Sequence, residues 1–251
     1  MFCSNGTISV LWNENRTYRI SPLCNDTTLM QKADSSTMRT YISPIGFNST
    51  SVTRPLLSRG IDTGDEVVLI RPNVEDDSRA TEAIGDVERL LQEIEPDVSI
   101  STERLPHTDF ERAILECSDL IRAAEGERIV TLGGGARDVL LPFSMAAITH
   151  VRLLDTVLFF SDIDGTVREW HLPRLTATLR ETTRSTLAAL DQEGGSSSIP
   201  TLTEVTGSSK STVTRHVHQL TDEGLVEVWS EGKTKHARIT LTGQLLLRNP
   251  V

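Results

Sequence analysis

The chain has 251 residues, of which 37% are hydrophobic and 24% are charged, and its formal net charge is −10. This length and apolar content are enough for one large domain or two modest ones. No apolar run approaches the roughly 20 residues of a membrane-spanning helix and no signal peptide opens the chain, so we expect no membrane partner. The cysteines, Cys3, Cys24 and Cys117, are odd in number and not spaced as metal pairs, which predicts a reducing cytoplasmic location and no metal site.

The charge is unevenly distributed along the chain. Residues 1–38 contain three basic and three acidic side chains and residues 182–251 contain seven of each, so the net charge of −10 lies in residues 39–181. Only four of the 25 basic residues are lysine. This acidic, arginine-rich balance is typical of proteins from salt-loving archaea, and an ordinary acidic bacterial protein fits it too.

The first 37 residues differ in composition from the rest of the chain. Residues 1–37 are rich in Asn, Ser and Thr and show no sustained hydrophobic period. Met38 is followed at once by the strand-like run RTYISPI. We therefore expect residues 1–37 to be either a disordered extension or a stretch upstream of the native start at Met38.

Residues 38–172 alternate short apolar runs with helical patterns. The apolar runs are YISPI (41–45), EVVLI (66–70), DVSISTE (97–103), RIVTL (128–132) and TVLFF (156–160). Strict alternation of strand and helix predicts an α/β, Rossmann-like domain whose parallel sheet is covered on both faces.

The stretch FFSDIDGTVREW (159–170) ends this domain and permits two interpretations. It looks like the nucleophile loop of the haloacid-dehalogenase-like phosphatases, in which Asp162 would attack a phosphoryl group and Asp164 would shuttle a proton. Alternatively, Asp164-Gly165 favours a tight type I′ turn between two antiparallel strands. A phosphatase of this kind needs its nucleophile loop near the start of the Rossmann fold and a lysine on a later strand of the same domain. Here the motif follows the fifth strand, and the lysines after it lie in a separate domain. The sequence therefore favours a C-terminal β-hairpin.

The last part of the chain changes character. We expect a linker helix over residues 173–182, with Leu175 and Leu179 on one face. Residues 183–251 then show three helical patterns and two strand patterns around Gly232. This order predicts an α+β winged helix-turn-helix domain.

The third helix of that domain carries the candidate DNA-binding surface. Val213, Val217 and Leu220 form its predicted buried face, and hydroxyl and cationic side chains on the other face suit contact with phosphates and base edges. The predicted DNA-binding residues are Ser208, Ser209, Lys210, Ser211, Thr212, Thr214, Arg215 and His216 in the helix and Lys233, Lys235 and His236 in the wing. Protein contact is the alternative role, favoured by the neutral net charge of the domain.

Two loops of the first domain are candidates for anion binding, because free N–H groups at a helix start favour phosphate. The loop after the first strand contains Gly46, Phe47, Asn48, Ser49 and Thr50, and the loop after the fourth contains Gly133, Gly134, Gly135, Ala136 and Arg137. Arg71, at the end of the second strand, is a further candidate. Neither loop matches a nucleotide-binding signature, and the glycine run equally suits tight helix–strand packing.

From Met38 onward the chain resembles the CRISPR-associated Rossmann-fold (CARF) regulators with a C-terminal winged helix. The resemblance is carried by TYISPIGFNSTSVTRPLL, GDEVVLIRP, TLGGGARDVLLPFSMAA and REWHLPRL, while SKSTVTRHVHQLTDEGLV resembles the MarR-type regulators. The resemblance implies a homodimer that binds cyclic oligoadenylate, in particular cyclic tetra-adenylate, with the two loops. It also implies binding to double-stranded promoter DNA of CRISPR–Cas genes, with no cofactor and no catalytic residue.

Three alternatives to this function stay open at the level of sequence. The first is a ring nuclease that degrades cyclic oligoadenylate, in which hydroxyls such as Ser49 would position a ribose. The second is a haloarchaeal winged-helix regulator unconnected with CRISPR. The third is a protein-interaction adaptor.

Overall fold

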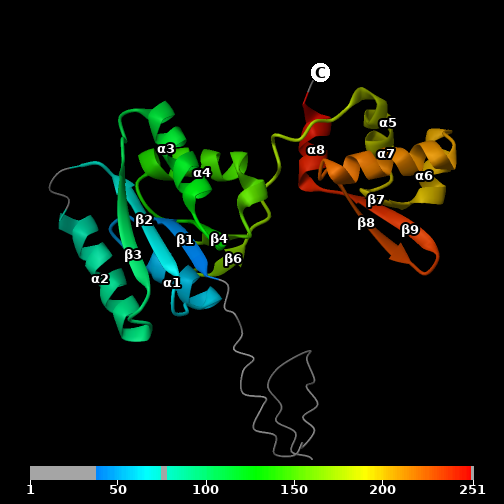
Figure 1. The fold of residues 1–251 in the computed structure, drawn as a ribbon. Helices are drawn as coiled ribbons and strands as arrows, with labels where there is room; N and C mark the ends of the chain where they lie inside the picture. The colour runs from blue at the N-terminus through cyan, green and yellow to red at the C-terminus, as the bar shows by residue number, and fades with distance from the viewer. Residues whose placement is uncertain (1–37, 75–77, 250–251) are drawn as a thin grey trace, which may run out of the picture. The chain divides into compact units, whose positions relative to one another are not determined.

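The computed structural model of the protein describes residues 38–74 and 78–249. The expectations for residues 1–37 lie outside this part of the chain. The described residues form an α/β domain and a winged-helix domain (Figure 1). No helix within the described ranges has the length and apolar character that crossing a membrane requires.

The first domain alternates strands and helices, as the sequence predicts. Its elements are β1 (Arg39–Pro44), α1 (Thr50–Arg59), β2 (Glu66–Pro72), α2 (Ser78–Ile94), β3 (Ser99–Leu105), α3 (Phe110–Ala123), β4 (Glu127–Leu132), α4 (Arg137–Thr149), the 3-10 helix η1 (Val151–Leu153), β5 (Thr156–Phe160) and β6 (Val167–Glu169).

The sheet has the strand order β3-β2-β1-β4-β5-β6, in which β1 to β5 are parallel and β6 is antiparallel. The chain moves from β1 outward to β3, and β4 then returns to the other side of β1. The strand order therefore reverses between β1 and β4. Open parallel sheets bind ligands at the carboxyl ends of their strands beside such a reversal, which is called a switch point.

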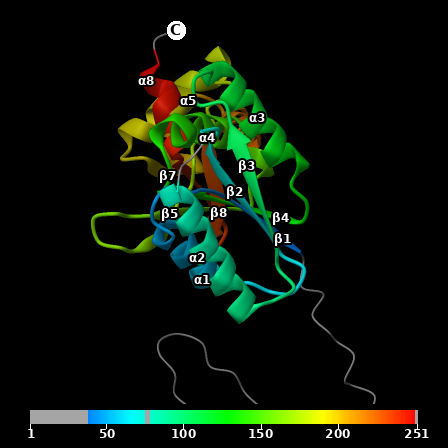
Figure 2. The same ribbon diagram turned by 90° about the vertical axis from the view of Figure 1, so that its left-hand side faces the viewer.

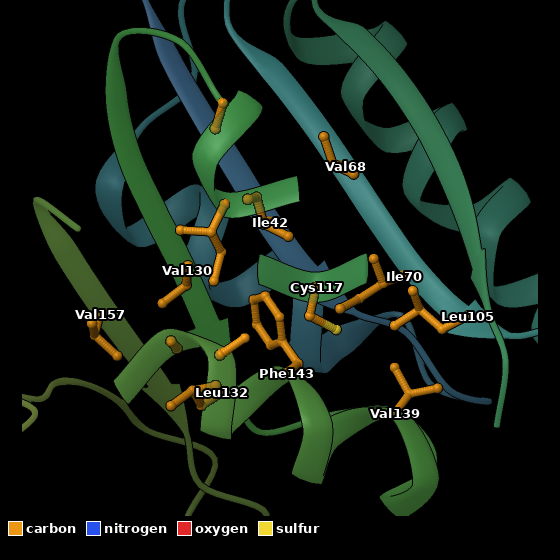
Figure 3. Close-up of a cluster of buried hydrophobic side chains, with 14 residues drawn as sticks. Ile42, Val68, Ile70, Leu105, Cys117, Val130, Leu132, Val139, Phe143 and Val157 are labelled. Carbon is orange, nitrogen blue, oxygen red and sulfur yellow. The ribbon is translucent and has the colours of Figure 1, made fainter. Parts of the chain in front are cut away.

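Helices cover both faces of the sheet (Figures 1 and 2), because successive strand residues point to opposite sides. On one face Ile42 packs with Phe143 of α4 and Cys117 of α3 (Figure 3). On the other face Tyr41 and Leu69 pack against α1 and α2. Burial raises the pKa of the Cys117 thiol to about 12, which keeps it protonated and unreactive.

β5 and β6 form the antiparallel hairpin that the sequence favours. Phe160 and Val167 are the last paired residues, so residues 161–166 form the loop. The prediction of a tight two-residue turn at Asp164-Gly165 is therefore wrong. The loop is longer because it contains one helical turn, closed by a backbone hydrogen bond from Gly165.

The Asp164 carboxylate is held by neighbouring residues of this hairpin. It accepts hydrogen bonds from the backbone N–H of Thr166 at 3.1 Å and from its hydroxyl at 2.8 Å, and it pairs with Arg168. The bonds from Thr166 are the main reason that the pKa of Asp164 is well below its usual range. An acid that stays ionised is unsuited to donating a proton at neutral pH. Both Asp162 and Asp164 are exposed turn residues.

The second domain is the predicted winged helix. Its elements are α5 (Glu181–Gln192), β7 (Ser196–Ser198), α6 (Ile199–Thr206), α7 (Lys210–Asp222), β8 (Val226–Glu231), β9 (Thr234–Ile239) and α8 (Leu241–Arg248). Ser198 and Ser209 cap α6 and α7, because each hydroxyl accepts a hydrogen bond from a backbone N–H three residues later at 3.2 Å. β8 and β9 form the wing. β7 and α8 are additions that the sequence did not predict.

The linker helix expected over residues 173–182 is not formed. Residues 173–180 are not helical, and α5 begins at Glu181. The linker is instead packed onto the winged helix: Ala177 is part of the core of that domain, and the N–H of Arg174 donates to the Thr242 hydroxyl at 2.9 Å. These tertiary contacts outweigh the helical pattern of the segment.

Candidate functional site

The two predicted anion-binding loops lie next to each other. They comprise residues 45–49 after β1 and residues 133–136 after β4, and with the first turn of α4 we call them the switch-point edge. A Cβ built on Gly46 would lie 3.3 Å from the Cα of Gly135, so the two loop backbones are in direct contact. The structure thus brings together the loops that the sequence proposed separately.

The glycine run of the second loop is required for packing. A Cβ on Gly133 would lie 2.4 Å from the carbonyl oxygen of Phe160, and one on Gly134 would lie 2.3 Å from the Ser51 Oγ. Gly135 has a φ of +85°, which favours glycine. The packing interpretation therefore accounts for these glycines, and their role in anion binding stays a prediction.

The start of α4 is open at the switch-point edge. Ala136 is the N-cap residue and makes no side-chain capping hydrogen bond. The N–H groups that begin a helix lack partners within it and carry the positive end of its dipole. In α4 the N–H of Val139 donates to the carbonyl oxygen of Ala136 at 3.0 Å, so the N–H groups of Arg137 and Asp138 are the ones that remain for a ligand. Arg137 and Asp138, both exposed, follow directly. Arg137 is thus the basic side chain at an uncapped helix start.

The loop after β1 is shaped by its own side chains. The Asn48 Oδ1 accepts a hydrogen bond from the N–H of Thr50 at 2.8 Å. Ser49 is the N-cap residue of α1 but makes no side-chain cap bond, so its hydroxyl is not used there. Phe47 is 58% exposed, and the guanidinium of Arg79 lies 3.8 Å from its ring centroid. Sequence reasoning missed Arg79, because nothing in its local pattern links it to Phe47.

Arg71 is not an exposed residue at the strand tip. Its side chain is 4% exposed and shares the face of Val67 and Leu69, toward α2. Its Nη1 donates to the Thr81 hydroxyl at 3.4 Å, and its Nε has no hydrogen-bond partner among the described residues. The structure therefore places the Arg71 side chain between β2 and α2, and its role in ligand binding stays a prediction.

The exposed face of α7 forms the second candidate site. A hollow of about 720 Å³ is lined by Lys210, Ser211, Thr214, Arg215 and His218. Four of these were predicted as DNA-binding residues, and His218 was missed. The signal for His218 was its spacing of four residues from Thr214, which puts both on one helix face.

Three other predicted residues at the start of α7 have local partners. The N–H of Ser208 donates to the Thr206 hydroxyl at 3.4 Å. The Ser209 hydroxyl caps the helix and lies 2.9 Å from the Thr212 hydroxyl. The Ser209 hydroxyl stabilises the start of α7, and Ser208, Ser209 and Thr212 are not among the residues that line its hollow.

The expectation that His216 is exposed is wrong. It is 8% exposed, and its Nδ1 shares a 2.8 Å hydrogen bond with the hydroxyl of Thr186 on α5. His216 lies three residues after Val213 and next to Val217, so it belongs to the buried face of the helix. Burial above all, and the nearby charge of Arg215, lower the pKa of His216.

The three predicted wing residues point in different directions. Lys235 lines a small pocket of about 100 Å³ between α7 and the wing. His236 stacks on Trp229 at 5.4 Å between ring centroids and lies 3.6 Å from the Glu231 carboxylate. Successive strand residues alternate between faces, so His236 lies on the opposite face from Lys235. Lys233 is exposed beside the turn at Gly232.

The fold and these two surfaces define a two-domain protein with a Rossmann-like domain and a winged helix with a cationic recognition face. Residues 39–162 match the family model of the Csa3 CRISPR-associated Rossmann-like domain, and residues 181–237 match that of the MarR family. The chain therefore has a Csa3-type CRISPR-associated Rossmann-like domain followed by a MarR-type winged helix. This combination supports a ligand-responsive transcriptional regulator that binds DNA.

The chain is similar to parts of several solved structures. BpsR of Bordetella bronchiseptica, whose DNA binding is regulated by 6-hydroxynicotinic acid, is 23% identical over 28% of this chain and 50% of its own, with a TM-score of 0.26. The PcaV transcriptional regulator of Streptomyces coelicolor is 26% identical over 28% and 51%, with a TM-score of 0.26. A protein of Vibrio cholerae is 11% identical over 80% and 62%, with a TM-score of 0.42. The chain thus spans about half the length of BpsR and PcaV. No curated protein matched it.

Proposed function

We propose that the protein is a homodimeric, cytoplasmic transcriptional regulator of CRISPR–Cas genes that binds cyclic oligoadenylate at its switch-point edge. The observation that carries this proposal is the direct contact of the two loops at the strand-order reversal of a domain of a CRISPR-associated family. The ligand that we propose is cyclic tetra-adenylate, and the second partner is promoter DNA.

The chemistry of the switch-point edge suits a phosphate-containing ring. The uncapped start of α4 presents backbone N–H groups, Arg137 adds a positive charge, and the Ser49 hydroxyl is available to a ribose. A two-fold dimer offers the same loops to each half of a ring that itself has rotational symmetry. One pair of loops per protomer is therefore enough to surround the ligand.

General electrostatics oppose the binding of this anionic ligand. The net charge of −10 lies in residues 39–181, so the few favourable groups act against a repulsive field. Removing one of them therefore costs a large share of the affinity. The loss is smaller at high salt, where long-range repulsion is screened.

The first experiment tests ligand binding by calorimetry with cyclic tetra-adenylate and cyclic hexa-adenylate. We expect the parent protein to bind one of the rings, and Arg137→Gln to weaken that binding about 10-fold through loss of a charge-assisted hydrogen bond. Arg122→Gln is the matched control, because it removes an exposed arginine of α3 that pairs with Asp119 of the same helix. No binding of either ring by the parent, or equal effects of the two substitutions, would remove the ligand half of the proposal.

The second experiment tests what the protein does with its ligand. We propose that cyclic oligoadenylate is bound and released intact. Incubation of the protein with cyclic tetra-adenylate followed by mass spectrometry should then return only the cyclic form. Linear products that disappear in Ser49→Ala would identify a ring nuclease instead.

A further inference from the structure

A small pocket connects the recognition helix to the wing. Its volume is about 100 Å³, and Thr214 and His218 line both this pocket and the larger hollow along α7. The two cavities therefore form one continuous surface, which begins beside Lys210 and ends at the wing. We call the smaller cavity the helix–wing pocket.

The helix–wing pocket has an apolar floor and a polar, cationic rim. Ile199 of α6, Val217 of α7 and Val228 of β8 contribute the floor. His218 and Lys235 are exposed and stand at the rim, on α7 and β9 respectively. An apolar floor below cationic or N–H-donating groups fits a ligand with a carbon-rich body and an adjacent anionic group.

We propose that the helix–wing pocket binds one sugar–phosphate unit of the DNA backbone, with the deoxyribose against the apolar floor and its phosphate held by His218 and Lys235. This inference rests on the proposed DNA-binding function and assigns a part of DNA to a part of the surface. An imidazole carries at least one N–H donor and a lysine carries three, so both side chains can donate to the same phosphate. The phosphate lies between the groove that α7 enters and the groove beside the wing.

The floor also discriminates between sugars. A ribose in the same position would carry its 2′-hydroxyl onto or near apolar side chains, where a hydroxyl without a partner is costly. A deoxyribose has no such group. The helix–wing pocket thereby favours DNA over RNA at this position, although the backbone contact itself carries no information about base sequence.

The side-chain test uses fluorescence anisotropy with the DNA upstream of the protein's own gene and with single base-pair variants of it. We expect His218→Ala and Lys235→Ala each to weaken binding about 3- to 10-fold. The factor should be the same for every sequence, and Lys235→Ala should lower the salt slope by about 1. His107→Ala is the matched control, because it removes a histidine that lies between β3 and α3 of the first domain, and it should change affinity less than twofold.

Two results would overturn the inference. Parent-like binding by His218→Ala would show that the pocket is not used, and a loss that varies with base sequence would make His218 a reader of base edges. Arg215→Ala separates this failure from failure of the proposed function. If Arg215→Ala abolishes binding while His218→Ala does not weaken it, the protein binds DNA without this pocket. If the parent does not bind DNA, both proposals fall.

The DNA-side test uses duplexes with one neutral methylphosphonate or one ribonucleotide at successive positions. We expect a position where the methylphosphonate weakens binding of the parent but not of His218→Ala. A ribonucleotide at the adjacent sugar should weaken the parent and have less effect on Val228→Ser, which places a hydroxyl in the floor. If the effects of His218→Ala and of the methylphosphonate add at every position, the two groups do not interact and the proposal is contradicted.

Discussion

At the scale of single residues, His216 shows how a polar side chain becomes part of a core. Its Nδ1 is satisfied by Thr186 at 2.8 Å, which makes burial of the neutral imidazole tolerable. Burial above all lowers its pKa below the ordinary value of 6.5. The residue therefore links the stability of the winged helix to pH.

This linkage gives a prediction about acid stability. Above pH 6.5 the imidazole is neutral in both states, so the stability it allows is fully present. As the pH falls below 6.5, the unfolded chain takes up the proton and the folded chain resists it, so stability is lost. Denaturant melts of His216→Gln at pH 7.5 and pH 5 should show a smaller pH effect than melts of the parent. Equal pH effects in the two proteins would contradict this role.

Gly134 is a second residue whose role is set by its neighbours. A Cβ there would lie 2.3 Å from the Ser51 Oγ, so Gly134→Ala should lower the free energy of unfolding by about 1–3 kcal/mol. Ser51→Gly removes both the Oγ and the Cβ that the new methyl would meet and should restore part of the loss. Gly85→Ala is the control, because its Cβ meets nothing within 4 Å. Chemical denaturation measures the free energy of unfolding of all three variants. Equal effects of Gly134→Ala and Gly85→Ala would show that the loop rearranges to accommodate the added methyl group.

Residue-level prediction from sequence succeeded where the periodicity was apolar and failed where tertiary contacts decide. Val213, Val217 and Leu220 are buried as their spacing indicates. The burial of Arg71 depends on α2, which packs over β2, and that of His216 depends on α5. A single helix or strand pattern does not contain the neighbouring element, so these two placements were beyond local reasoning.

At the scale of elements, the alternation of strands and helices was predictable because a parallel sheet needs a crossover after each strand. The hairpin at β5 and β6 was predictable as a pairing, but its turn was not. The hydrogen bonds of Asp164 with Thr166 and Arg168 stabilise a longer loop than the Asp-Gly dipeptide alone favours. β7 has three serines and is too short to show an alternating pattern.

The linker is the element where sequence reasoning gave the wrong structure. The spacing of Leu175 and Leu179 suggested a helix, yet residues 173–180 follow the surface of the winged helix. Leu179 packs against the core of that domain, and Leu175 is 50% exposed. The segment thus obtains its stability from another element and not from a helical ladder of its own.

At the scale of the whole molecule, the linker has anchors on both domains that are close in sequence. Trp170 stacks on Phe159 of β5 at 3.9 Å between centroids, and Leu172 packs against the core of the Rossmann-like domain. Two residues after Leu172, Arg174 contacts the winged helix. Pro173 is the residue that separates these two sets of contacts along the chain.

Arg174 meets the C-terminal end of the recognition helix. Its Nη1 donates to the carbonyl oxygen of Asp222 at 3.3 Å, and its Nη2 lies 3.9 Å from the Glu223 carboxylate. The Nε is buried without a hydrogen-bond partner within the described residues. A cation at a helix C-terminus is favourable for the helix dipole. Arg174 therefore joins the linker to the end of α7, the helix that carries the candidate DNA-binding face.

We predict that Arg174 is a residue through which a ligand on the first domain changes DNA binding. A ligand changes DNA affinity only as far as it favours one conformational state over another, and the linker contacts must differ between those states. Arg174→Met keeps much of the apolar stem but removes the bonds to Asp222 and Glu223. We expect it to bind cyclic tetra-adenylate as the parent does, while the ligand-induced change in promoter affinity falls at least about threefold.

Arg180→Met is the matched control, because it removes an exposed arginine from the end of the same linker. Calorimetry gives the ligand affinity, and anisotropy with and without ligand gives the coupling. A full ligand effect in Arg174→Met, or an equal loss in Arg180→Met, would show that coupling takes another route.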